Sequence, residues 1–410
     1  MTNPMPLSAR AWAHALAAAL TDPSAELATA THPPVPQSLA TGAAGVALLH
    51  LERAYSDPVH ANTAHAWITA ATAEPVTSNG NATLFHGVPA LAFTVTAAAE
   101  ATSAYHHAHA QLEFATAKLT RARLDTAHAR IDRRERPTLA EFDLIRGLTG
   151  LGALHLYRDP HSEITAAVLN YLVRLTLPLA DTDDLPGWWS EHGPRNEPSE
   201  QFPGGHGNLG LAHGITGPLA LLAIAARAGI LIDGHHDAIT RIFAWLDTWQ
   251  RHHPAGTWWP RIITLEEART GTLHQDGPQQ PSWCYGTPGI ARAQQLAALA
   301  TGDAARQALA EAALADCLAD PGQLARIVDV SLCHGAAGLL HTTWRAAHDA
   351  TTPALTNAIP RLAELLIRRL ADTPERGGLL EGSTGAALAL HTLTNGNAPR
   401  SLWDRCLLLA

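Results

Sequence analysis

A short glycine motif followed by a run of apolar residues recurs along the chain. In each copy a glycine stands three residues before a second glycine or an alanine, and a nearly all-apolar stretch follows. The seven copies are 42–50, 87–93, 147–155, 214–222, 286–290, 335–340 and 382–390. Their first glycines are 45 to 72 residues apart, which leaves room in each interval for two helices and their connections. One such motif is weak evidence in a chain rich in alanine and glycine, but seven in the same context predict a helical repeat.

The apolar and polar positions predict helices of two kinds. Segments such as 220–226 are apolar all round, as expected of helices that lie inside. Segments between the motifs, such as 112–134 and 304–320, carry charge on one face and are expected to form an outer layer. We therefore predict an all-α fold, an α/α toroid with seven inner and seven outer helices, formed as a single domain by residues 1–410. An open solenoid is the alternative, but its terminal repeats would need polar caps.

Two intervals are longer than a pair of helices requires. The segments 181–208 and 254–281 are rich in proline and glycine and contain the pairs Trp188-Trp189 and Trp258-Trp259. Long loops without periodicity are usually functional or disordered, and tryptophan pairs argue against disorder because their apolar faces need cover. We interpret both segments as ordered rim loops at one mouth of the ring. Packing of each tryptophan pair on the outer helices is an equally good interpretation.

Composition and charge narrow the functional classes. The net charge of -9, without any basic cluster, argues against a nucleic-acid-binding protein. Four cysteines in 410 residues fit a reducing compartment, which predicts a cytoplasmic protein. No window approaches the length of apolar sequence that a membrane-spanning helix needs. Residues 11–20 are apolar, but the segment is short and lacks a basic start, which disfavours a signal peptide.

Two cysteines stand next to copies of the glycine motif. Cys284 lies two residues before the glycine at 286, and the pair Cys333-His334 lies directly before the glycine at 335. A cysteine at the mouth of a helix feels the positive end of the helix dipole, which favours the thiolate that binds metal. Cys284, Cys333 and His334 are therefore predicted ligands of one zinc ion, with the fourth position open as in a catalytic site. Buried cysteines without a metal are the plainer interpretation, and the repeated context argues against it.

The types of ligand indicate which reaction such a zinc ion would support. A water molecule in the open position would give hydrolysis, whereas a substrate thiol there would have its pKa lowered towards thiolate at neutral pH. Two thiolate ligands donate charge to the metal and weaken it as a Lewis acid for water. Thiol activation is therefore favoured over hydrolysis.

Three further residues are candidates for catalytic roles. His213 directly precedes its glycine motif, as His334 does, and Asp143 lies four residues before Gly147. An imidazole can donate and accept a proton near neutral pH, and a carboxylate beside it can fix its tautomer. Tyr285 could donate its O–H group to a developing oxyanion. Helix capping or hydrogen bonding in the core is the alternative role for each.

Together these motifs resemble the lanthionine synthetase C-like family, the lanthipeptide cyclases. The resemblance rests on the segments 38–45, 84–89, 143–150, 208–218, 283–289, 333–338 and 381–385, and it covers nearly the whole chain. It implies a double ring of helices and a zinc ion bound by two cysteines and one histidine, which correspond to Cys284, Cys333 and His334. It also implies that His213 is the acid–base residue and that Asp143 is the nearby aspartate.

The resemblance further implies a Michael addition within a precursor peptide, as in lantibiotic biosynthesis. A cysteine thiolate of the peptide would attack Cβ of a dehydroalanine or dehydrobutyrine, and protonation at Cα by His213 would leave a lanthionine or methyllanthionine thioether. The implied partners are a dehydrated precursor peptide with its leader, a separate dehydratase and an ABC transporter, so that this chain would be a stand-alone cyclase. A basic residue is expected shortly before Trp283, but positions 279–282 read Gln-Gln-Pro-Ser.

Two other functions are compatible with the same residues. One is a cyclase-like enzyme that adds glutathione to dehydrated residues of other proteins. The other is a zinc-containing scaffold that binds peptides without turnover.

Overall fold

The computed structural model describes residues 7–24, 35–179, 185–194, 197–372 and 377–410, and this part of the chain is mainly helical. It divides into two compact units. Unit 1 comprises Met1–Thr116 and Ile327–Cys406, and unit 2 comprises Ala117–Arg326 and Leu407–Ala410. In both units, buried helices that follow a glycine motif pack against helices with a more polar face. This division does not test our prediction that residues 1–410 form a single domain, which stays a prediction.

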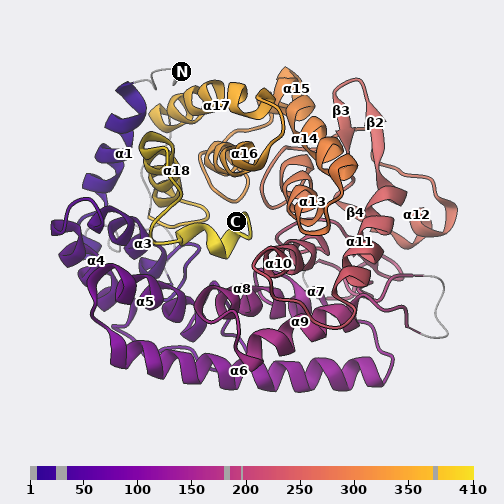
Figure 1. Ribbon diagram of the computed structural model, residues 1–410, viewed down its shortest axis with the longest axis horizontal. Helices are drawn as coiled ribbons and strands as arrows, with labels where there is room; N and C mark the ends of the chain where they lie inside the picture. The colour runs from indigo at the N-terminus through magenta and orange to yellow at the C-terminus, as the bar shows by residue number, and fades with distance from the viewer. Residues whose placement is uncertain (1–6, 25–34, 180–184, 195–196, 373–376) are drawn as a thin grey trace. The chain divides into compact units, whose positions relative to one another are not determined.

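In unit 1 the helices that follow glycine motifs are buried along most of their length. They are α3 (Ala43–Ala54), α5 (Val88–Thr102), α16 (Ala336–Asp349) and α18 (Ser383–Asn395). Helices with an exposed face cover them: α4 (Val59–Ala71) packs on α3, α17 (Ala354–Ala371) on α16 and α1 (Leu7–Ala19) on α18 (Figure 1). In α17 the apolar residues recur at helical spacing and form the buried face, namely Leu355, Ile359, Leu362, Leu366 and Leu370. α6 (His106–Asp132) begins in unit 1 and ends in unit 2.

Unit 2 repeats this arrangement. Its buried helices are α8 (Leu148–Arg158), α10 (Thr216–Arg227) and α13 (Thr287–Thr301), and α10 packs against both of the others. They are covered in turn by α9 (Glu163–Leu175), α11 (His235–Trp249) and α14 (Ala304–Ala319). Short helices complete the chain: α7 (Leu139–Phe142), α12 (Leu265–Thr270), α15 (Pro321–Ala325) and the 3-10 helix η1 (Trp403–Leu407). Each of the seven predicted glycine motifs is thus followed by a helix.

The second glycine of the motif is needed for close packing of the preceding loop. A Cβ atom at Gly289 would overlap the carbonyl oxygen of Trp283, and one at Gly338 would overlap that of Leu332. In both cases the carbonyl belongs to the residue six positions earlier, so the loop folds back over the first turn of its helix. Any side chain at these positions would push the loop away, and with it the adjacent Cys284 or Cys333.

Short strands lie within and directly before the two long segments for which the sequence predicts no secondary structure. β1 (His206–Asn208) pairs antiparallel with β4 (Ile262–Thr264), with His206 opposite Thr264, and β2 (Arg251–His253) pairs with β3 (Gly256–Trp258). Strands of three residues are too short to show an alternating pattern, so the sequence gives no signal for them. The β1–β4 pairing joins the two long segments to each other, although residues 181–184 and 195–196 of the first lie outside the described residues.

All four tryptophans of these segments are buried. Trp188 packs edge-on against Trp245 of α11, and the indole Nε1 of Trp259 donates a hydrogen bond to the carbonyl of Leu246, also in α11. Both pairs therefore pack on a covering helix, which is the second of the two interpretations above. A role for these segments at a mouth of the ring stays a prediction.

A buried charged group stabilises unit 1. The carboxylate of Asp404 accepts hydrogen bonds from Arg345 Nε at 2.6 Å, Arg345 Nη2 at 2.9 Å and His341 Nε2 at 2.7 Å. Burial by itself raises the pKa of Asp404, but the Arg345 charge and the His341 hydrogen bond outweigh it and hold the pKa well below its usual value. None of the helices in the described ranges is long and apolar enough to cross a bilayer.

Candidate active site

Three neighbouring loops of unit 2 are hydrogen-bonded to one another through their backbones. They precede α8, α10 and α13. Leu144 N donates to Ala212 O at 3.1 Å, and Leu211 N donates to Cys284 O at 3.0 Å. The segments around Asp143, His213 and Tyr285 are therefore held side by side, at the N-terminal ends of three packed helices.

Asp143 is fully buried and both of its carboxylate oxygens are used. Oδ1 accepts from the backbone N–H groups of Arg146 and Gly147, at the start of α8, and Oδ2 faces His213. A carboxylate at a helix N-terminus interacts favourably with the exposed N–H groups and the helix dipole. Arg146 adds its guanidinium, with Nε 3.6 Å from Oδ2.

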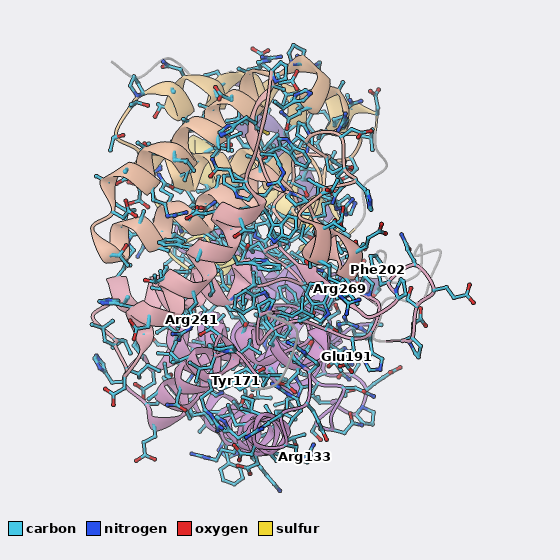
Figure 2. The ribbon with its side chains drawn as sticks, turned by 90° about the vertical axis from the view of Figure 1, so that its right-hand side faces the viewer. Arg133, Tyr171, Glu191, Phe202, Arg241 and Arg269 are labelled. Atoms are coloured by element: carbon cyan, nitrogen blue, oxygen red, sulfur yellow. The ribbon has the colours of Figure 1, made fainter. Side chains whose placement is uncertain are left out.

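The helix before Asp143 is anchored by a second polar cluster. Glu141 of α7 accepts hydrogen bonds from Arg130 Nε at 3.0 Å, Arg130 Nη2 at 2.7 Å and the hydroxyl of Tyr171 at 2.7 Å. Tyr171, labelled in Figure 2, is fully buried, and burial raises its pKa well above the usual value. By contrast Arg133, also labelled there, is exposed and forms an ion pair with Glu135. The buried cluster fixes α7 and so the position of Asp143.

His213 is oriented by Asp143. Its Nδ1 lies 2.7 Å from Asp143 Oδ2, and the imidazole is about one third exposed. Because a carboxylate only accepts, Nδ1 carries the hydrogen of this bond, which leaves Nε2 to face outward. A proton at that nitrogen can be taken up or given up while Asp143 holds the ring in place.

Tyr285 lies beside this imidazole. The two rings stack with centroids 6.3 Å apart, and Asn208 Nδ2 donates to the Tyr285 hydroxyl at 2.9 Å. Since the hydroxyl oxygen accepts from Asn208, its hydrogen is left to donate to another group. Burial raises the pKa of Tyr285 to about 12, so the phenol keeps its proton at neutral pH.

Arg261 supplies a positive charge that the sequence analysis did not assign to this site. Its guanidinium carbon lies 4.7 Å from the centroid of the Tyr285 ring, within range of a cation–π contact. Arg261 precedes β4 and is 24 positions from Tyr285 in the sequence, so no periodic pattern links them. Asn208, in contrast, lies within one of the segments that carry the family resemblance, but no pattern in the sequence relates it to Tyr285.

Cys284 is buried in the same loop. Ser282 Oγ lies 3.5 Å from the Sγ of Cys284; the hydroxyl also donates to Tyr285 O and accepts from Tyr285 N. These hydrogen bonds form a tight turn that fixes the position of the sulfur. The indole of Trp283 donates to Leu407 O at 2.9 Å, and Arg292 of α13 donates to Leu409 O at 2.8 and 3.0 Å. The loop and its helix are therefore braced by residues from the far end of the sequence.

In unit 1, Cys333 and His334 occupy the corresponding loop before α16. Cys333 N donates to Leu380 O at 3.0 Å, and His334 N donates to Ser331 Oγ at 3.1 Å. His334 is exposed, and its Nε2 lies 3.4 Å from Asp329 Oδ2. A carboxylate beside an imidazole is a common arrangement around metal-binding histidines, because it fixes the ring. Asp329 lies outside the motif segments, so no pattern in the sequence points to it.

Cys284, Cys333 and His334 together form a group of side chains that could hold a metal ion. Two thiols and one imidazole are ligand types that zinc prefers, so the residues present fit the metal predicted from the sequence. Their function as ligands, like the catalytic roles of His213, Asp143 and Tyr285, stays a prediction.

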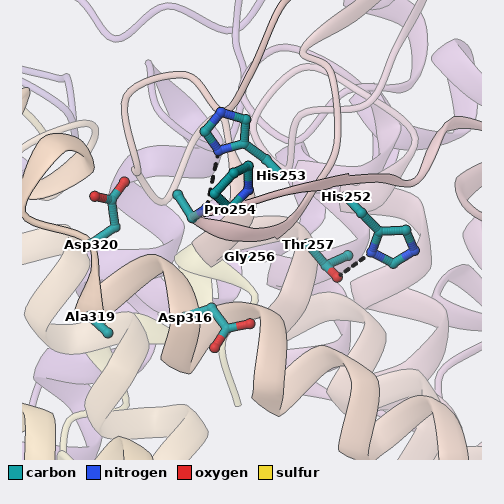
Figure 3. A pocket seen from close by; sticks show the side chains of 9 residues that line it. His252, His253, Pro254, Gly256, Thr257, Asp316, Ala319 and Asp320 are labelled. Atoms are coloured by element: carbon teal, nitrogen blue, oxygen red, sulfur yellow. Dashed lines mark hydrogen bonds between the residues drawn. The ribbon is translucent and has the colours of Figure 1, made fainter.

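An open cavity of about 700 Å³ lies elsewhere in unit 2. Figure 3 shows its lining, which includes His252 and His253 of β2 and Asp316 and Asp320 near the end of α14. Nδ1 of His252 is hydrogen-bonded to the Thr257 hydroxyl, and Nδ1 of His253 accepts a hydrogen bond from the backbone N–H of Ala255. Both rings are therefore held by the β2–β3 hairpin. None of the predicted site residues lines this cavity.

Comparisons with known proteins agree with this arrangement. Residues 33–408 match the family described as "Lanthionine synthetase C-like protein". The chain is 25% identical over 284 residues to "Nisin biosynthesis protein NisC" of Lactococcus lactis subsp. lactis; the match covers 67% of this chain and 66%, just under two thirds, of that protein. The solved structure "Nisin cyclase" matches with a TM-score of 0.81 and 20% identity, over 98% of this chain and 97% of that one. The structural likeness confirms the predicted α/α toroid class.

Proposed function

Because the chain belongs to the lanthionine synthetase C-like family, we propose that it is a zinc-dependent lanthipeptide cyclase. The reaction would be an intramolecular Michael addition that joins a cysteine of a precursor peptide to a dehydroalanine or dehydrobutyrine. The observation that carries this proposal is the hydrogen-bonded pair of His213 and Asp143. This pair lies beside Tyr285, which directly follows Cys284 in the same loop. A proton donor, a hydroxyl and a metal-binding sulfur side by side are what addition of a thiol to an unsaturated carbonyl compound requires.

Cys284, Cys333 and His334 would hold the zinc ion. When bound there, zinc lowers the pKa of a substrate thiol so that thiolate forms at neutral pH. The support for this assignment is the donor set itself, two sulfurs and one imidazole in one candidate metal-binding group.

The residues of unit 2 would manage charge and protons during the addition. As the new S–Cβ bond forms, the electron pair of the Cα–Cβ double bond moves towards the carbonyl oxygen and gives an enolate. The Tyr285 O–H group, whose oxygen already accepts from Asn208, can donate to that oxygen. His213 Nε2 would take up the proton that the substrate thiol loses and then deliver it to Cα, while its Nδ1–H bond to Asp143 keeps the ring in position. The thiol hydrogen and the proton added at Cα balance, so nothing is released.

Arg261 is our proposal for the positive charge that the segment 279–282 lacks. Its guanidinium stands over the Tyr285 ring, where it would favour negative charge on an oxygen bound by the phenol. Arg146 is less suitable, because its guanidinium already lies beside the carboxylate of Asp143 and donates a hydrogen bond to Pro194 O.

The proposed substrate is a dehydrated precursor peptide that carries a leader. A separate dehydratase would prepare it, and an ABC transporter would export the product. Both partners are proposed from the family to which the chain belongs.

Incubation with a dehydrated candidate precursor tests the function directly. Ring closure consumes one free thiol for each thioether without a change in peptide mass, so alkylation of the remaining thiols followed by mass spectrometry counts the rings. We expect full protection from alkylation with the wild type and loss or misdirection of ring closure with His213→Asn, which should keep its zinc. His236→Asn, on the exposed face of α11, is the matched control. Wild-type rates in His213→Asn would remove His213 from the mechanism.

The same assay separates the two other functions. Addition of glutathione to dehydrated residues would appear as a gain of the mass of glutathione in reactions that contain it. A peptide-binding scaffold would bind the precursor but leave every thiol open to alkylation over hours.

A further inference from the structure

A second polar cluster lies in unit 1, on elements that carry no predicted catalytic or metal-binding residue. Its members come from α1, α3, α4 and α18, with α1 packed on α18 and α4 on α3 (Figure 1). They line a cavity of about 170 Å³, and they include two arginines, three histidines and one aspartate: Arg10, Arg53, His14, His60, His391 and Asp57.

Arg53 is the central residue of this cavity. Its side chain is only 8% exposed, yet both of its described hydrogen-bond partners are imidazoles: His60 Nε2 at 3.1 Å from Nε, and His14 Nδ1 at 2.9 Å from Nη2. The third nitrogen, Nη1, is buried and has no hydrogen-bond partner in the part of the chain that the structure describes. Burying an arginine in this way is costly, because both hydrogen-bonded acceptors are neutral; burial lowers the pKa of Arg53, and the charge of Asp57 offsets this only in part.

The hydrogen bonds fix which nitrogen of each histidine carries a hydrogen. Arginine can only donate, so His60 accepts at Nε2 and carries its hydrogen on Nδ1, 3.3 Å from His50 Nδ1. His50 in turn carries its hydrogen on Nε2, 2.6 Å from the carbonyl of Leu20. Burial lowers the pKa of His50 to about 4, which agrees with a neutral ring.

The same reasoning leaves further donors at the cavity. His14 accepts from Arg53 at Nδ1, so its hydrogen is on Nε2. His391 accepts from Asn395 at Nε2, 2.9 Å away, so its hydrogen is on Nδ1. Together with Arg53 Nη1 and the exposed Arg10, the lining therefore offers N–H donors and positive charge. Asp57 is the opposing charge, and one of its oxygens already accepts from the backbone N–H of Val59.

We propose that this cavity binds a tetrahedral oxyanion of the phosphate class, with Arg53 at its buried end and Arg10 at its rim. An anion there would satisfy Arg53 Nη1 and compensate the charge, and guanidinium groups are well suited to phosphate oxygens. A volume of 170 Å³ corresponds to the liquid volume of about six water molecules, enough for one such group but not for a nucleotide. A metal cation is disfavoured because the ring nitrogens facing Arg53 are engaged and the arginine would repel it.

Calorimetric titration with inorganic phosphate at constant ionic strength tests the proposal. We expect a Kd of about 1 mM or tighter for the wild type. Arg53→Gln removes a charge-assisted contact and should weaken binding by about 10- to 100-fold. Arg10→Gln, an exposed rim change that leaves the core intact, should weaken it by about two- to fivefold. Arg361→Gln, at an exposed position of α17 in the same unit, should bind as the wild type does.

Histidine ring signals in nitrogen-15 NMR locate the site without any variant, which matters if Arg53→Gln does not fold. Phosphate should shift the rings of His14 and His391 and leave those of His252 and His253 in place. A phosphoserine peptide, tested in parallel, distinguishes a phosphate ester from the free anion as the ligand, and binding of either supports the proposal. Binding of neither, binding unchanged in a folded Arg53→Gln variant, or shifts confined to His252 and His253 would overturn it.

Discussion

Replacing Asp143 by asparagine should reverse the tautomer of His213. The two side chains have the same shape, but one oxygen becomes an NH2 group. Asp143 Oδ1 accepts from two backbone N–H groups, those of Arg146 and Gly147, so the amide oxygen of asparagine must take that place. The NH2 group then faces His213 Nδ1, which has to accept instead of donating. The imidazole hydrogen moves to Nε2.

The opposite orientation of the amide is much less favourable. It would set the NH2 group against both backbone N–H groups and leave these without an acceptor, at about 1–3 kcal/mol each, or about 2–6 kcal/mol in total. Moving the hydrogen between the two ring nitrogens keeps every hydrogen bond. With Nε2 protonated in the neutral ring, His213 can no longer take up a proton there, and we expect ring closure to slow on the order of 10³- to 10⁴-fold, as a reversed histidine tautomer does in serine proteases.

Two measurements test the tautomer of His213 and the rate of ring closure independently. Nitrogen-15 NMR of the His213 ring reports the tautomer without substrate, and the alkylation time course reports the rate. Asp247→Asn, at an exposed carboxylate of α11, is the matched control and should change neither. A His213 ring that keeps its hydrogen on Nδ1 in Asp143→Asn would refute the argument from hydrogen bonding. A reversed tautomer with a wild-type rate would instead refute the role of Nε2.

Three further outcomes follow from the structure. Cys333→Ala should lose zinc and ring closure together, as measured by metal analysis and thiol counting; retention of one equivalent of zinc would remove Cys333 from the ligand set. Arg261→Gln should keep zinc but slow ring closure by about tenfold, since a charge near Tyr285 is lost; an unchanged rate would assign Arg261 to packing alone. Asp404→Ala should lower the free energy of unfolding by about 3–5 kcal/mol at pH 7 in urea titrations, because it leaves Arg345 buried without its partner. Because the folded state lowers the pKa of Asp404, this stabilisation is present above the unfolded-state pKa of about 4 and is lost progressively as the pH falls from there towards the lowered folded-state pKa, so the difference between wild type and variant should shrink as the pH is lowered below about 4.

The helical framework could be predicted because its signals are local. A glycine motif and an apolar run mark the start of each of these buried helices in the sequence. Gly289 and Gly338 lie in close contact with the preceding loops, which explains why the motif recurs. The short strands could not be predicted, since three residues show no periodicity. Segment 11–20 falls mostly within α1; Leu16 of α1 and Leu20 directly after it are buried, so the segment is not an isolated apolar stretch.

The candidate site was predictable only in part, for the same reason. Position relative to the glycine motif was enough to nominate His213 and Asp143, because equivalent loops lie at equivalent helix ends. Nothing local relates Arg261 to Tyr285, since a strand and a short helix separate them and only the folded chain brings them together. The same holds for the tryptophan pairs, whose partners on α11 are set by packing that sequence spacing does not encode.

The bonds that Trp283 and Arg292 make to Leu407 and Leu409 mean that unit 2 cannot be isolated by a single cut. A fragment ending at Arg326 would contain every side chain of the proposed proton-transfer group, yet it would lack the two carbonyls that brace the cysteine loop from more than a hundred positions away. That loop therefore depends on a contact of very long sequence separation, and contacts of this kind are among the slowest to form during folding. Removal of Leu407 and Leu409 should therefore disturb the loop that holds the sulfur of Cys284.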